Sequence, residues 1–281
     1  MHVEAFAPAK VNLTLHVTGR RADGYHLLES LVVFPDIGDR LSFAPSDDLS
    51  LEVRGPLAEG VPTDESNLCL RAARLLSSSK GARITLEKHL PHGAGIGGGS
   101  ADAAATLRGL SRLWGEPLPE AAEVAALGAD VPVCLAAPKP MVMRGIGEIL
   151  SPAPALPSFA ALLVNPRVET PTGAIFAALA ASGTIKNSPM PEMPASFATL
   201  SDFARWLRLT RNDLEEAASG FAPIGEVKAA IEGQAGCAFA RMSGSGSTCF
   251  GLFESAARAE AAAAAIRRTH PDWWIASGEV S

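Results

Sequence analysis

Five glycines fall within the seven residues from Gly93 to Gly99, between a strand-like segment and an alanine-rich one. Without Cβ atoms, such a loop can bring its backbone N–H groups close to an anion, and a helix that follows adds the positive end of its dipole. A plain hinge needs only one or two glycines, and each further glycine adds backbone entropy cost. The segment therefore predicts a phosphate-binding loop.

The residues on either side of the loop predict a strand before it and a helix after it. Residues 83–90 alternate and are rich in Ile, Thr and Leu, and Pro91 then ends ladder pairing. We expect the helix to begin near Ser100, a good N-cap, and to run to Trp114, where Gly115 ends it. A strand, a loop and a helix in this order are the context that a phosphate loop requires.

Several kinds of phosphate loop are possible. Gly93, Gly95 and Gly98 satisfy the GxGxxG pattern of dinucleotide-binding folds. Those folds also have an acidic residue about 20 positions further on, after a second strand. Glu116 and Glu120 are near that distance, but their surroundings read as helix. The sequence has no GxxxxGK[ST] loop and no VAIK, HRD or DFG segment. A third kind of ATP loop is favoured, and an NAD-binding dehydrogenase is the alternative.

The composition fits a well-buried globular enzyme. A chain of 281 residues exceeds the usual size of a single core, so we expect two domains. Hydrophobic residues make up 47% and charged ones 19%, which argues against disorder. The net charge of −6 disfavours a nucleic-acid partner.

Targeting and metal signals are also absent from the sequence. The first residues lack the pattern of a secretory signal, and no apolar run approaches the ~20 residues of a membrane span, so we expect a cytoplasmic protein without a membrane partner. The four cysteines show no CxxC spacing and the six histidines no HExxH spacing. We expect no structural metal, and any Mg²⁺ should arrive with the nucleotide.

Strands and helices alternate along the chain, which predicts an α+β protein in two parts. Residues 151–158 contain three prolines and predict a boundary, with domains at 1–151 and 159–281. The proline-rich residues 182–197 predict a mobile surface loop. The expected strands are 11–17, 27–34, 40–45, 49–55, 83–90, 159–165, 237–242 and 248–253, and the expected helices are 67–79, 100–114, 119–127, 173–181, 201–209, 214–219, 225–232 and 256–269.

Residue types that suit acid–base or charge-stabilising roles occur in three other segments. The segment PAKVN places Lys10 and Asn12 two positions apart, hence on one face if it forms a strand. The turn ADGYH presents Tyr25 and His26 together, and LGADVP places Asp130 in a constrained turn. Each residue alone also has an ordinary interpretation, as a solvent-exposed lysine, a turn anchor, a surface histidine or a local cap.

A second loop of small residues, ARMSGSGSTCFG, lies between two predicted strands near the C-terminus. Gly244 and Gly246 alternate there with Ser243, Ser245 and Ser247. The hydroxyls and amides of this loop could hold a second part of an anionic substrate.

Together and in this order, these segments resemble the GHMP small-molecule kinase superfamily. The resemblance covers most of the chain, through PAKVNLTLHVTGRRADGYH, SNLCLRAARLL, PHGAGIGGGSADAAATL, GADVPVCL, RGIGEIL, ETPTGAIF, RNDLE and MSGSGSTCFG. It implies a two-domain α+β fold, with an N-terminal domain like domain 2 of ribosomal protein S5, containing a left-handed βαβ crossover, and a ferredoxin-like C-terminal domain. The MSGSGS segment resembles the superfamily's third motif, which packs beside the phosphate loop.

The resemblance also implies a reaction. Its combination of segments implies transfer of phosphate from ATP, with Mg²⁺, to the 2-hydroxyl of 4-diphosphocytidyl-2-C-methyl-D-erythritol, a cytidine diphosphate derivative of the non-mevalonate isoprenoid pathway. A GHMP kinase for homoserine or a mevalonate derivative is the nearest alternative, because it would share Lys10 and the glycine loop. A catalytically silent nucleotide-binding module is a further class, against which the presence of both Lys10 and Asp130 argues.

Each matching residue receives an implied role. Lys10 and Asp130 match the catalytic pair, with Asp130 facing the acceptor hydroxyl, and Phe176 matches an aromatic ring that sandwiches cytosine opposite Tyr25. His26 is our candidate for discriminating cytosine. The implied ATP-binding residues are Asn67, Lys88, Pro91, Gly93, Ala94, Gly95, Ile96, Gly97, Gly98, Gly99, Ser100 and Ala101, of which Asn67 and Lys88 match positions that line the adenine side. The implied substrate-binding residues are Asn12, Tyr25, His26, Thr172, Phe176, Gly244 and Ser245. His92 departs from the pattern, and residues 182–206 match nothing in it.

Overall fold

The computed structural model describes residues 2–183 and 185–280, and they form two compact units that interleave along the sequence. Unit 1 contains residues 2–10, 38–92 and 97–137. Unit 2 contains residues 11–37, 93–96 and the described residues from 138 onward. The chain therefore leaves unit 1 after residue 92 and returns to it at residue 97, within the glycine loop. The predicted domains, 1–151 and 159–281, stay a prediction.

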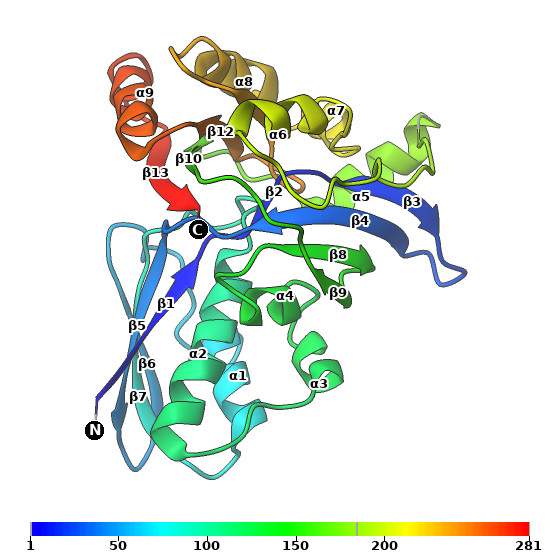
Figure 1. Cartoon of the computed structure of the whole chain (residues 1–281). Coiled ribbons are helices and arrows are strands. Elements are labelled where there is room, and N and C mark those ends of the chain that lie inside the picture. The colour runs from blue at the N-terminus through cyan, green and yellow to red at the C-terminus, as the bar shows by residue number, and fades with distance from the viewer. Residues whose placement is uncertain (1, 184, 281) are drawn as a thin grey trace. The chain divides into compact units, whose positions relative to one another are not determined.

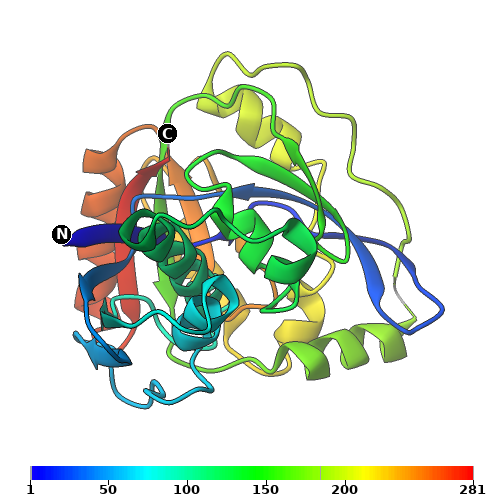
Figure 2. The ribbon, with the colours of Figure 1, turned by 90° about the horizontal axis from the view of Figure 1, so that it is seen from below.

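Unit 1 is built on a sheet with two helices against it. Its strand order is β1-β5-β7-β6, antiparallel except for the parallel pair of β6 and β7, which α1 connects. Figure 2 shows α1 and α2 side by side, and α2 also contacts β1, β5 and α4. The expected left hand of the crossover stays a prediction. The elements are β1 (Val3–Pro8), β5 (Gly38–Pro45), β6 (Leu49–Arg54), α1 (Leu68–Leu76), β7 (Ala82–Glu87), α2 (Gly98–Trp114), α3 (Ala121–Ala125) and α4 (Val131–Leu135) (Figure 1).

Helix α2 packs closely on the sheet of unit 1. A Cβ atom built on Gly109 would lie 2.2 Å from a ring carbon of Phe43, which is fully buried on β5. Only glycine permits this approach, because real Cβ contacts essentially never fall below about 3 Å. The contact fixes α2 against β5, and with it the position of the glycine-rich end of the helix.

The start of α2 differs from the sequence-based expectation. The helix begins at Gly98, and the N-cap is Gly97, whose φ of +64° lies in the left-handed region. Ser100 is therefore inside the first turn, and its expected role as N-cap is wrong. The expected end is confirmed, because the helix stops at Trp114 with Gly115 as a left-handed C-cap.

Unit 2 contains two further sheets. One has the antiparallel order β11-β12-β10-β13, and helices α8 and α9 pack on it around a core that includes Phe253. The other has the order β2-β4-β8-β9, with β3 also paired to β4. The elements are β2 (Val11–Asn12), β3 (His16–Arg20), β4 (His26–Val33), β8 (Met141–Gly145), β9 (Ile149–Pro152), β10 (Phe159–Asn165), α5 (Thr172–Ser182), α6 (Leu200–Leu207), α7 (Glu215–Ala218), α8 (Ile224–Glu232), β11 (Phe239–Met242), β12 (Cys249–Phe253), α9 (Ala256–Thr269) and β13 (Trp274–Val280).

The expected α+β class is confirmed, with differences at particular strands. The predicted strand 11–17 is interrupted between β2 and β3, and β1, β8, β9 and β13 have no predicted counterpart. Strand β9 extends to Pro152, inside the proline-containing segment 151–158 that predicts a boundary.

The proline-rich segment in unit 2 contacts other residues of that unit, and its expected mobility stays a prediction. The carbonyl of Ser188 accepts a hydrogen bond from Arg211 at 2.8 Å, and the Met190 N–H donates to Glu29 at 2.8 Å. Phe197 is only 8% exposed. These contacts hold the segment against its own unit, whereas residue 184 lies outside the described residues.

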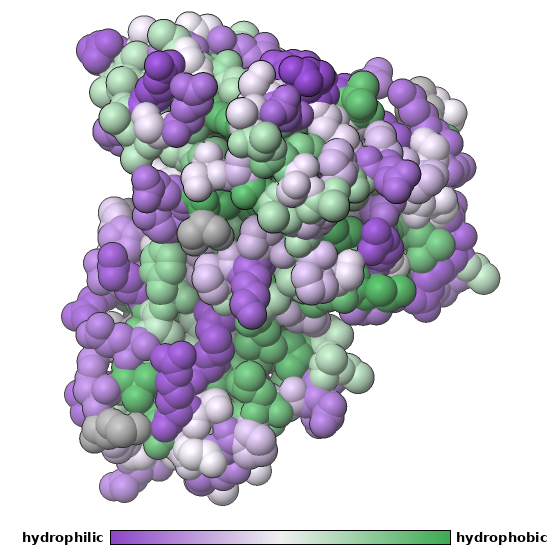
Figure 3. Space-filling view, in the orientation of Figure 1, coloured by the Kyte–Doolittle hydropathy of each residue, from purple (hydrophilic) through white to green (hydrophobic). Residues whose placement is uncertain are grey.

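The surface drawn in Figure 3 intersperses hydrophilic and hydrophobic residues over the elements of unit 1. Among the described residues, no helix combines the length and the apolar character that crossing a membrane requires.

Candidate functional site

The structure brings together the two residues predicted as a catalytic pair, which lie 120 positions apart in unit 1. Lys10 Nζ donates to Asp130 Oδ2 at 2.7 Å. The side chain of Lys10 is 6% exposed, whereas that of Asp130 is 34% exposed. The pair thus combines a buried ammonium with a carboxylate that an incoming hydroxyl can reach.

Local structure explains the position of each member of the pair. Lys10 follows the end of β1 and lies in no strand, so the expected strand face shared with Asn12 is not formed. Asp130 is the residue before α4, whose first turn contains Pro132. Proline restricts the backbone where the chain turns into that short helix, and the hydrogen bond from Lys10 orients the carboxylate.

The beginning of α2 lies beside the catalytic pair within unit 1. A Cβ atom on Gly97 would lie 3.1 Å from Cβ of Lys10, and one on Gly128 would lie 3.9 Å from Oγ of Ser100. The first N–H groups of a helix have no partner inside it, and together with the helix dipole they form an anion site. The predicted phosphate-binding backbone at Gly98 and Ser100 therefore lies next to Lys10 and the turn that carries Asp130.

The earlier half of the glycine loop packs on the MSGSGS loop within unit 2. A Cβ atom on Gly95 would lie 2.3 Å from the carbonyl oxygen of Gly246, and φ of Gly95 is +71°. Ser243 Oγ donates to the Gly95 carbonyl at 3.3 Å, and Thr248 Oγ1 donates to the Ala94 carbonyl at 2.7 Å. The packing implied by the resemblance between the third motif and the phosphate loop is thus observed.

The predicted substrate-binding residues of unit 2 include an aromatic stack. The rings of His26 and Phe176 have centroids 5.1 Å apart and an interplanar angle of 21°. Tyr25 is 62% exposed. Burial, together with the nearby Arg20 charge, lowers the pKa of His26, so the imidazole is neutral near pH 7. The expected cytosine sandwich between Tyr25 and Phe176 stays a prediction.

Polar side chains with unused capacity lie among these predicted residues. Asn12 donates to Ser30 Oγ at 2.7 Å, but its buried Oδ1 finds no partner among the described residues. The buried Nε2 of His26 also has no hydrogen-bond partner among the described residues. Thr172 and Ser245 share a hydrogen bond of 2.8 Å. Buried polar atoms are nearly always paired, so unpaired ones at a predicted site are positions that a polar ligand can satisfy.

Two residues predicted to line the adenine side have protein partners instead. Asn67 caps α1 by accepting from Cys69 N–H at 2.8 Å, and its amide donates to the Pro62 carbonyl at 2.7 Å. Lys88 contacts the carboxylates of Asp39 and Asp102, which no sequence motif had indicated. Their adenine contacts stay predictions. Of the other predicted ATP-binding residues, Ala94, Ile96 and Ala101 are buried, so at these positions the backbone is what a ligand could reach.

The charge of Lys88 and the charges of its two aspartate partners affect the pKa values within this group. Burial opposes the charge of Lys88, but Asp102 and Asp39 outweigh it and raise the pKa of Lys88 to about 12. Burial raises the pKa of Asp102 above its usual range, against the attraction of Lys88. Lys88 is therefore charged at neutral pH.

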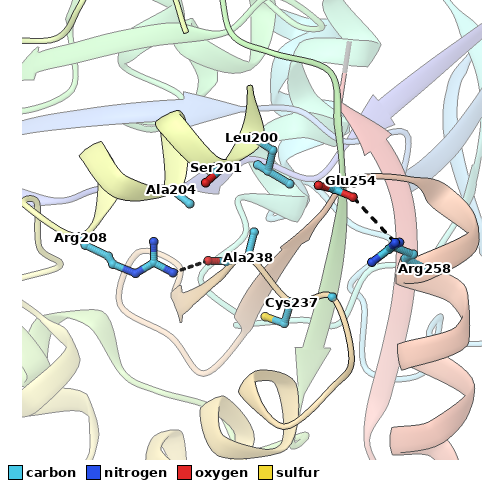
Figure 4. Close-up of a pocket in the computed structure, with 9 residues that line it drawn as sticks. Leu200, Ser201, Ala204, Arg208, Cys237, Ala238, Glu254 and Arg258 are labelled. Atoms are coloured by element: carbon cyan, nitrogen blue, oxygen red, sulfur yellow. Dashed lines mark hydrogen bonds and ion pairs between the residues drawn. The ribbon is translucent and has the colours of Figure 1, made fainter. Parts of the chain in front are cut away.

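A surface pocket of about 300 Å³ in unit 2 involves none of the predicted site residues. Figure 4 shows Arg208 donating to the Ala238 carbonyl, at 2.6 Å, and Arg258 paired with Glu254 at 3.9 Å. The lining residues are Leu200, Ser201, Ala204, Arg208, Gly236, Cys237, Ala238, Glu254 and Arg258. The described residues contain no group of three or more His, Cys, Asp or Glu side chains placed to hold a metal ion.

Comparison with known proteins decides the family. The family models described as the N-terminal domain and the C-terminal domain of GHMP kinases match residues 67–137 and 195–272. A 4-diphosphocytidyl-2-C-methyl-D-erythritol kinase of Cereibacter sphaeroides is 56% identical over 97% of both chains. This chain belongs to the GHMP kinase family. The GHMP kinase of the same description from Ruegeria pomeroyi is 54% identical over 100% of both chains.

Solved GHMP kinase structures agree with this assignment. A crystal structure of 4-(cytidine 5'-diphospho)-2C-methyl-D-erythritol kinase is 36% identical, with a TM-score of 0.76 over 98% of both chains. Homoserine kinase from Cytophaga hutchinsonii shares the fold, with a TM-score of 0.66 at 20% identity over 100% of this chain and 94% of that chain. The expected two-domain GHMP kinase fold is confirmed. The C-terminal family model includes residues 195–206, part of the segment that showed no resemblance from sequence alone.

Proposed function

We propose that this chain phosphorylates the 2-hydroxyl of 4-diphosphocytidyl-2-C-methyl-D-erythritol with ATP, in the non-mevalonate route to isoprenoid precursors. The observation that carries the chemistry is the hydrogen-bonded pair of Lys10 and Asp130 beside the first turn of α2. The choice of acceptor is supported by relatives that are described as 4-diphosphocytidyl-2-C-methyl-D-erythritol kinases and are 54–56% identical over nearly the full chain.

The proposed catalytic step relies on positioning and charge rather than on covalent help from the protein. Phosphoryl transfer passes through a loose transition state whose charge is spread over the phosphoryl oxygens. The first N–H groups of α2 would hold the polyphosphate, and the dipole of a 17-residue helix would favour its negative charge. Mg²⁺ bound with ATP would neutralise further charge on the phosphates.

Asp130 is the proposed proton acceptor for the alcohol. Its Oδ2 accepts from Lys10 and its side chain is one-third exposed, so the other carboxylate oxygen can accept from a bound hydroxyl. As the bond between the alcohol oxygen and the γ-phosphorus forms, the bond from that phosphorus to the β–γ bridging oxygen breaks, ADP leaves, and the alcohol proton passes to Asp130. Lys10 would offset the negative charge that grows on the reacting oxygens.

The cytidine end of the substrate would bind to the predicted residues of unit 2. The aromatic faces of Phe176 and Tyr25 suit stacking on a pyrimidine, which is tolerant of base identity. Discrimination of cytosine would therefore require hydrogen bonds, for which the neutral ring of His26 offers the unpaired Nε2. The unpaired Oδ1 of Asn12 would accept from another substrate hydroxyl or amine.

A panel of acceptors tests the proposal. The purified chain is incubated with Mg²⁺-ATP and either the cytidine substrate, homoserine or mevalonate; ADP release is followed, and phosphorus NMR locates the new phosphate. We expect turnover with the cytidine substrate alone, with phosphate on its 2-hydroxyl. Preferential turnover of homoserine or mevalonate would reject the proposed acceptor. Stabilisation by NAD but not by ATP in a thermal-shift assay would instead favour the dinucleotide-binding alternative.

A further inference from the structure

A buried cluster of one lysine and two aspartates lies inside unit 1, and the proposed reaction does not use it. Lys88 Nζ is 2.5 Å from Asp39 Oδ2 and 2.8 Å from Asp102 Oδ2. The exposed fractions of these side chains are 5%, 0% and 5%. The three charged groups therefore face one another, and solvent hardly reaches them.

The cluster joins three elements of unit 1. Asp39 is the second residue of β5, Lys88 directly follows β7, and Asp102 lies on α2. The second oxygen of Asp39 accepts from the backbone N–H of His89 at 2.5 Å and of Leu90 at 2.9 Å. One carboxylate thus fixes both the ammonium and the two backbone groups that lead to Pro91.

These contacts lie at both ends of the glycine loop. The chain leaves unit 1 after residue 92, shortly beyond the N–H groups that Asp39 holds, and it returns at Gly97, immediately before α2. Lys88 Nζ lies 3.7 Å from where a Cβ atom on Gly98 would be, and Leu90 Cβ lies 3.6 Å from the same point. The ammonium is therefore packed against the first residue of the helix that we expect to hold phosphate.

Stability alone does not explain a cluster of this composition. Burying ions is costly, and well-packed hydrophobic side chains of similar volume often give equal or greater stability. The three residues carry a formal charge of −1, and Asp102 Oδ1 finds no hydrogen-bond partner among the described residues. Charge-assisted hydrogen bonds fix distance and direction, which apolar contacts do not. Such a cluster is suited to holding backbone in a defined place.

We infer that Lys88, Asp39 and Asp102 are positioning residues for the glycine loop, and that they hold its two ends so that the first N–H groups of α2 are pre-organised for the polyphosphate of ATP. This inference rests on the proposed kinase function. It gives Lys88 a different role from the adenine contact implied by the resemblance, because both carboxylates already engage its ammonium.

The test removes the directional contacts while conserving volume. The double variant Lys88→Met/Asp102→Asn leaves the formal charge of the cluster unchanged and leaves Asp39 its two backbone N–H donors. Dissociation constants for the ATP analogue adenylyl imidodiphosphate are measured by titration calorimetry, next to melting temperatures and steady-state kinetics. We expect the Kd of the analogue and the KM of ATP to rise at least tenfold, while the KM of the cytidine substrate stays within twofold.

A matched control is available on the same helix. Lys80 Nζ binds the carbonyl of Trp114, at the last residue of α2, and Glu116 at 2.6 Å. Lys80→Met therefore removes a lysine that binds the opposite, C-terminal end of α2. We expect it to lower the melting temperature without changing the Kd of the ATP analogue by more than twofold. A merely structural role for Lys88 would make the two lysine substitutions behave alike.

The outcomes separate this inference from the proposed function. If the double variant does not fold, Asp102→Asn carries the test, with an expected rise of at least threefold in the Kd of the analogue. A folded variant that binds the analogue within twofold of wild type overturns the inference, as does an equal loss in Lys80→Met. Wild-type protein that does not bind the analogue overturns the kinase proposal as well. Tight binding with turnover of another acceptor rejects only the proposed acceptor.

Discussion

Replacing Asp130 by asparagine tests the proposed catalytic step most directly. The substitution keeps the shape of the side chain but removes its charge and its ability to accept the alcohol proton. A positioned general base contributes about 10²- to 10⁴-fold to rate. We therefore expect kcat to fall by this amount, which corresponds to about 3–5 kcal/mol of activation free energy. The KM of ATP should stay within about threefold, because the phosphate-binding N–H groups of α2 are untouched.

The effect on stability can be bounded from the geometry of the pair. The variant leaves the ammonium of Lys10 without its carboxylate partner, which lies at 2.7 Å in the wild type. Exposed pairs contribute about 0–1 kcal/mol, and breaking a fully buried pair costs about 3–5 kcal/mol. Because Lys10 is buried and Asp130 is 34% exposed, solvent screens the pair partly, so we expect a loss of about 1–2 kcal/mol.

A second ion pair in unit 1 serves as the control. Glu116 lies 2.6 Å from Lys80, and each side chain is 38% exposed. Glu116→Gln should lower the melting temperature by no more than Asp130→Asn does and should leave kcat within twofold. Turnover is followed by coupled ADP release and unfolding by circular dichroism. Turnover of Asp130→Asn within tenfold of wild type would refute the assigned role, and an equal fall in Glu116→Gln would show that lost stability is the cause.

Further substitutions test the rest of the site and the fold. Phe176→Ala and Tyr25→Ala should each raise the KM of the cytidine substrate about tenfold, because stacking on an aromatic ring is worth about 1–3 kcal/mol per base; if steady-state kinetics show no change in either, the sandwich is rejected. Gly95→Ala should weaken nucleotide binding in a titration by more than tenfold, since its Cβ would lie 2.3 Å from the Gly246 carbonyl oxygen at a φ of +71°, and wild-type affinity would contradict the observed packing. Burial lowers the pKa of His16 from 6.5 to about 4. Between these two pH values the unfolded chain binds a proton at His16 that the folded chain does not bind. The free energy of unfolding should therefore fall as the pH is lowered from 6.5 to 4, by at most about 3 kcal/mol. Urea unfolding at pH 7 and pH 5 measures that fall, which should be smaller in His16→Gln.

The parts of the fold that local sequence determines could be predicted. Among the described residues, each helix except α4 has a predicted counterpart, because apolar periodicity is a local signal. The end of α2 at Gly115 follows from a residue type that tolerates left-handed backbone. The start of α2 was misplaced because Ser100 is a better N-cap by residue type than Gly97. The structure uses the glycine because its left-handed conformation lets the chain turn sharply next to Lys10.

The strands that escaped prediction depend on pairing with distant residues. Strand β13 pairs along its whole length with β10, more than a hundred positions earlier. Within it, a Cβ atom on Gly278 would lie 2.1 Å from the side chain of Asp36 and 2.7 Å from that of Ile37, so close packing favours a residue that weakens the strand pattern. Strand propensity reflects such neighbours more than the strand's own residues, and for this reason β13 showed little local signal.

In the candidate site too, the role of a single side chain depends on neighbours that are distant in sequence. Lys10 and Lys88 are both buried lysines beside carboxylates, and both were predicted to serve the reaction. What separates them is the exposure of the partner, since Asp130 is 34% exposed and Asp102 only 5%. A carboxylate that meets solvent can accept a proton from an incoming alcohol, whereas one sealed between a strand and a helix can act only by holding them in place. Both residues are lysines, and both pair with carboxylates that are distant in sequence. The distinction between a reacting and a positioning group therefore becomes visible only when the exposure of their partners is known.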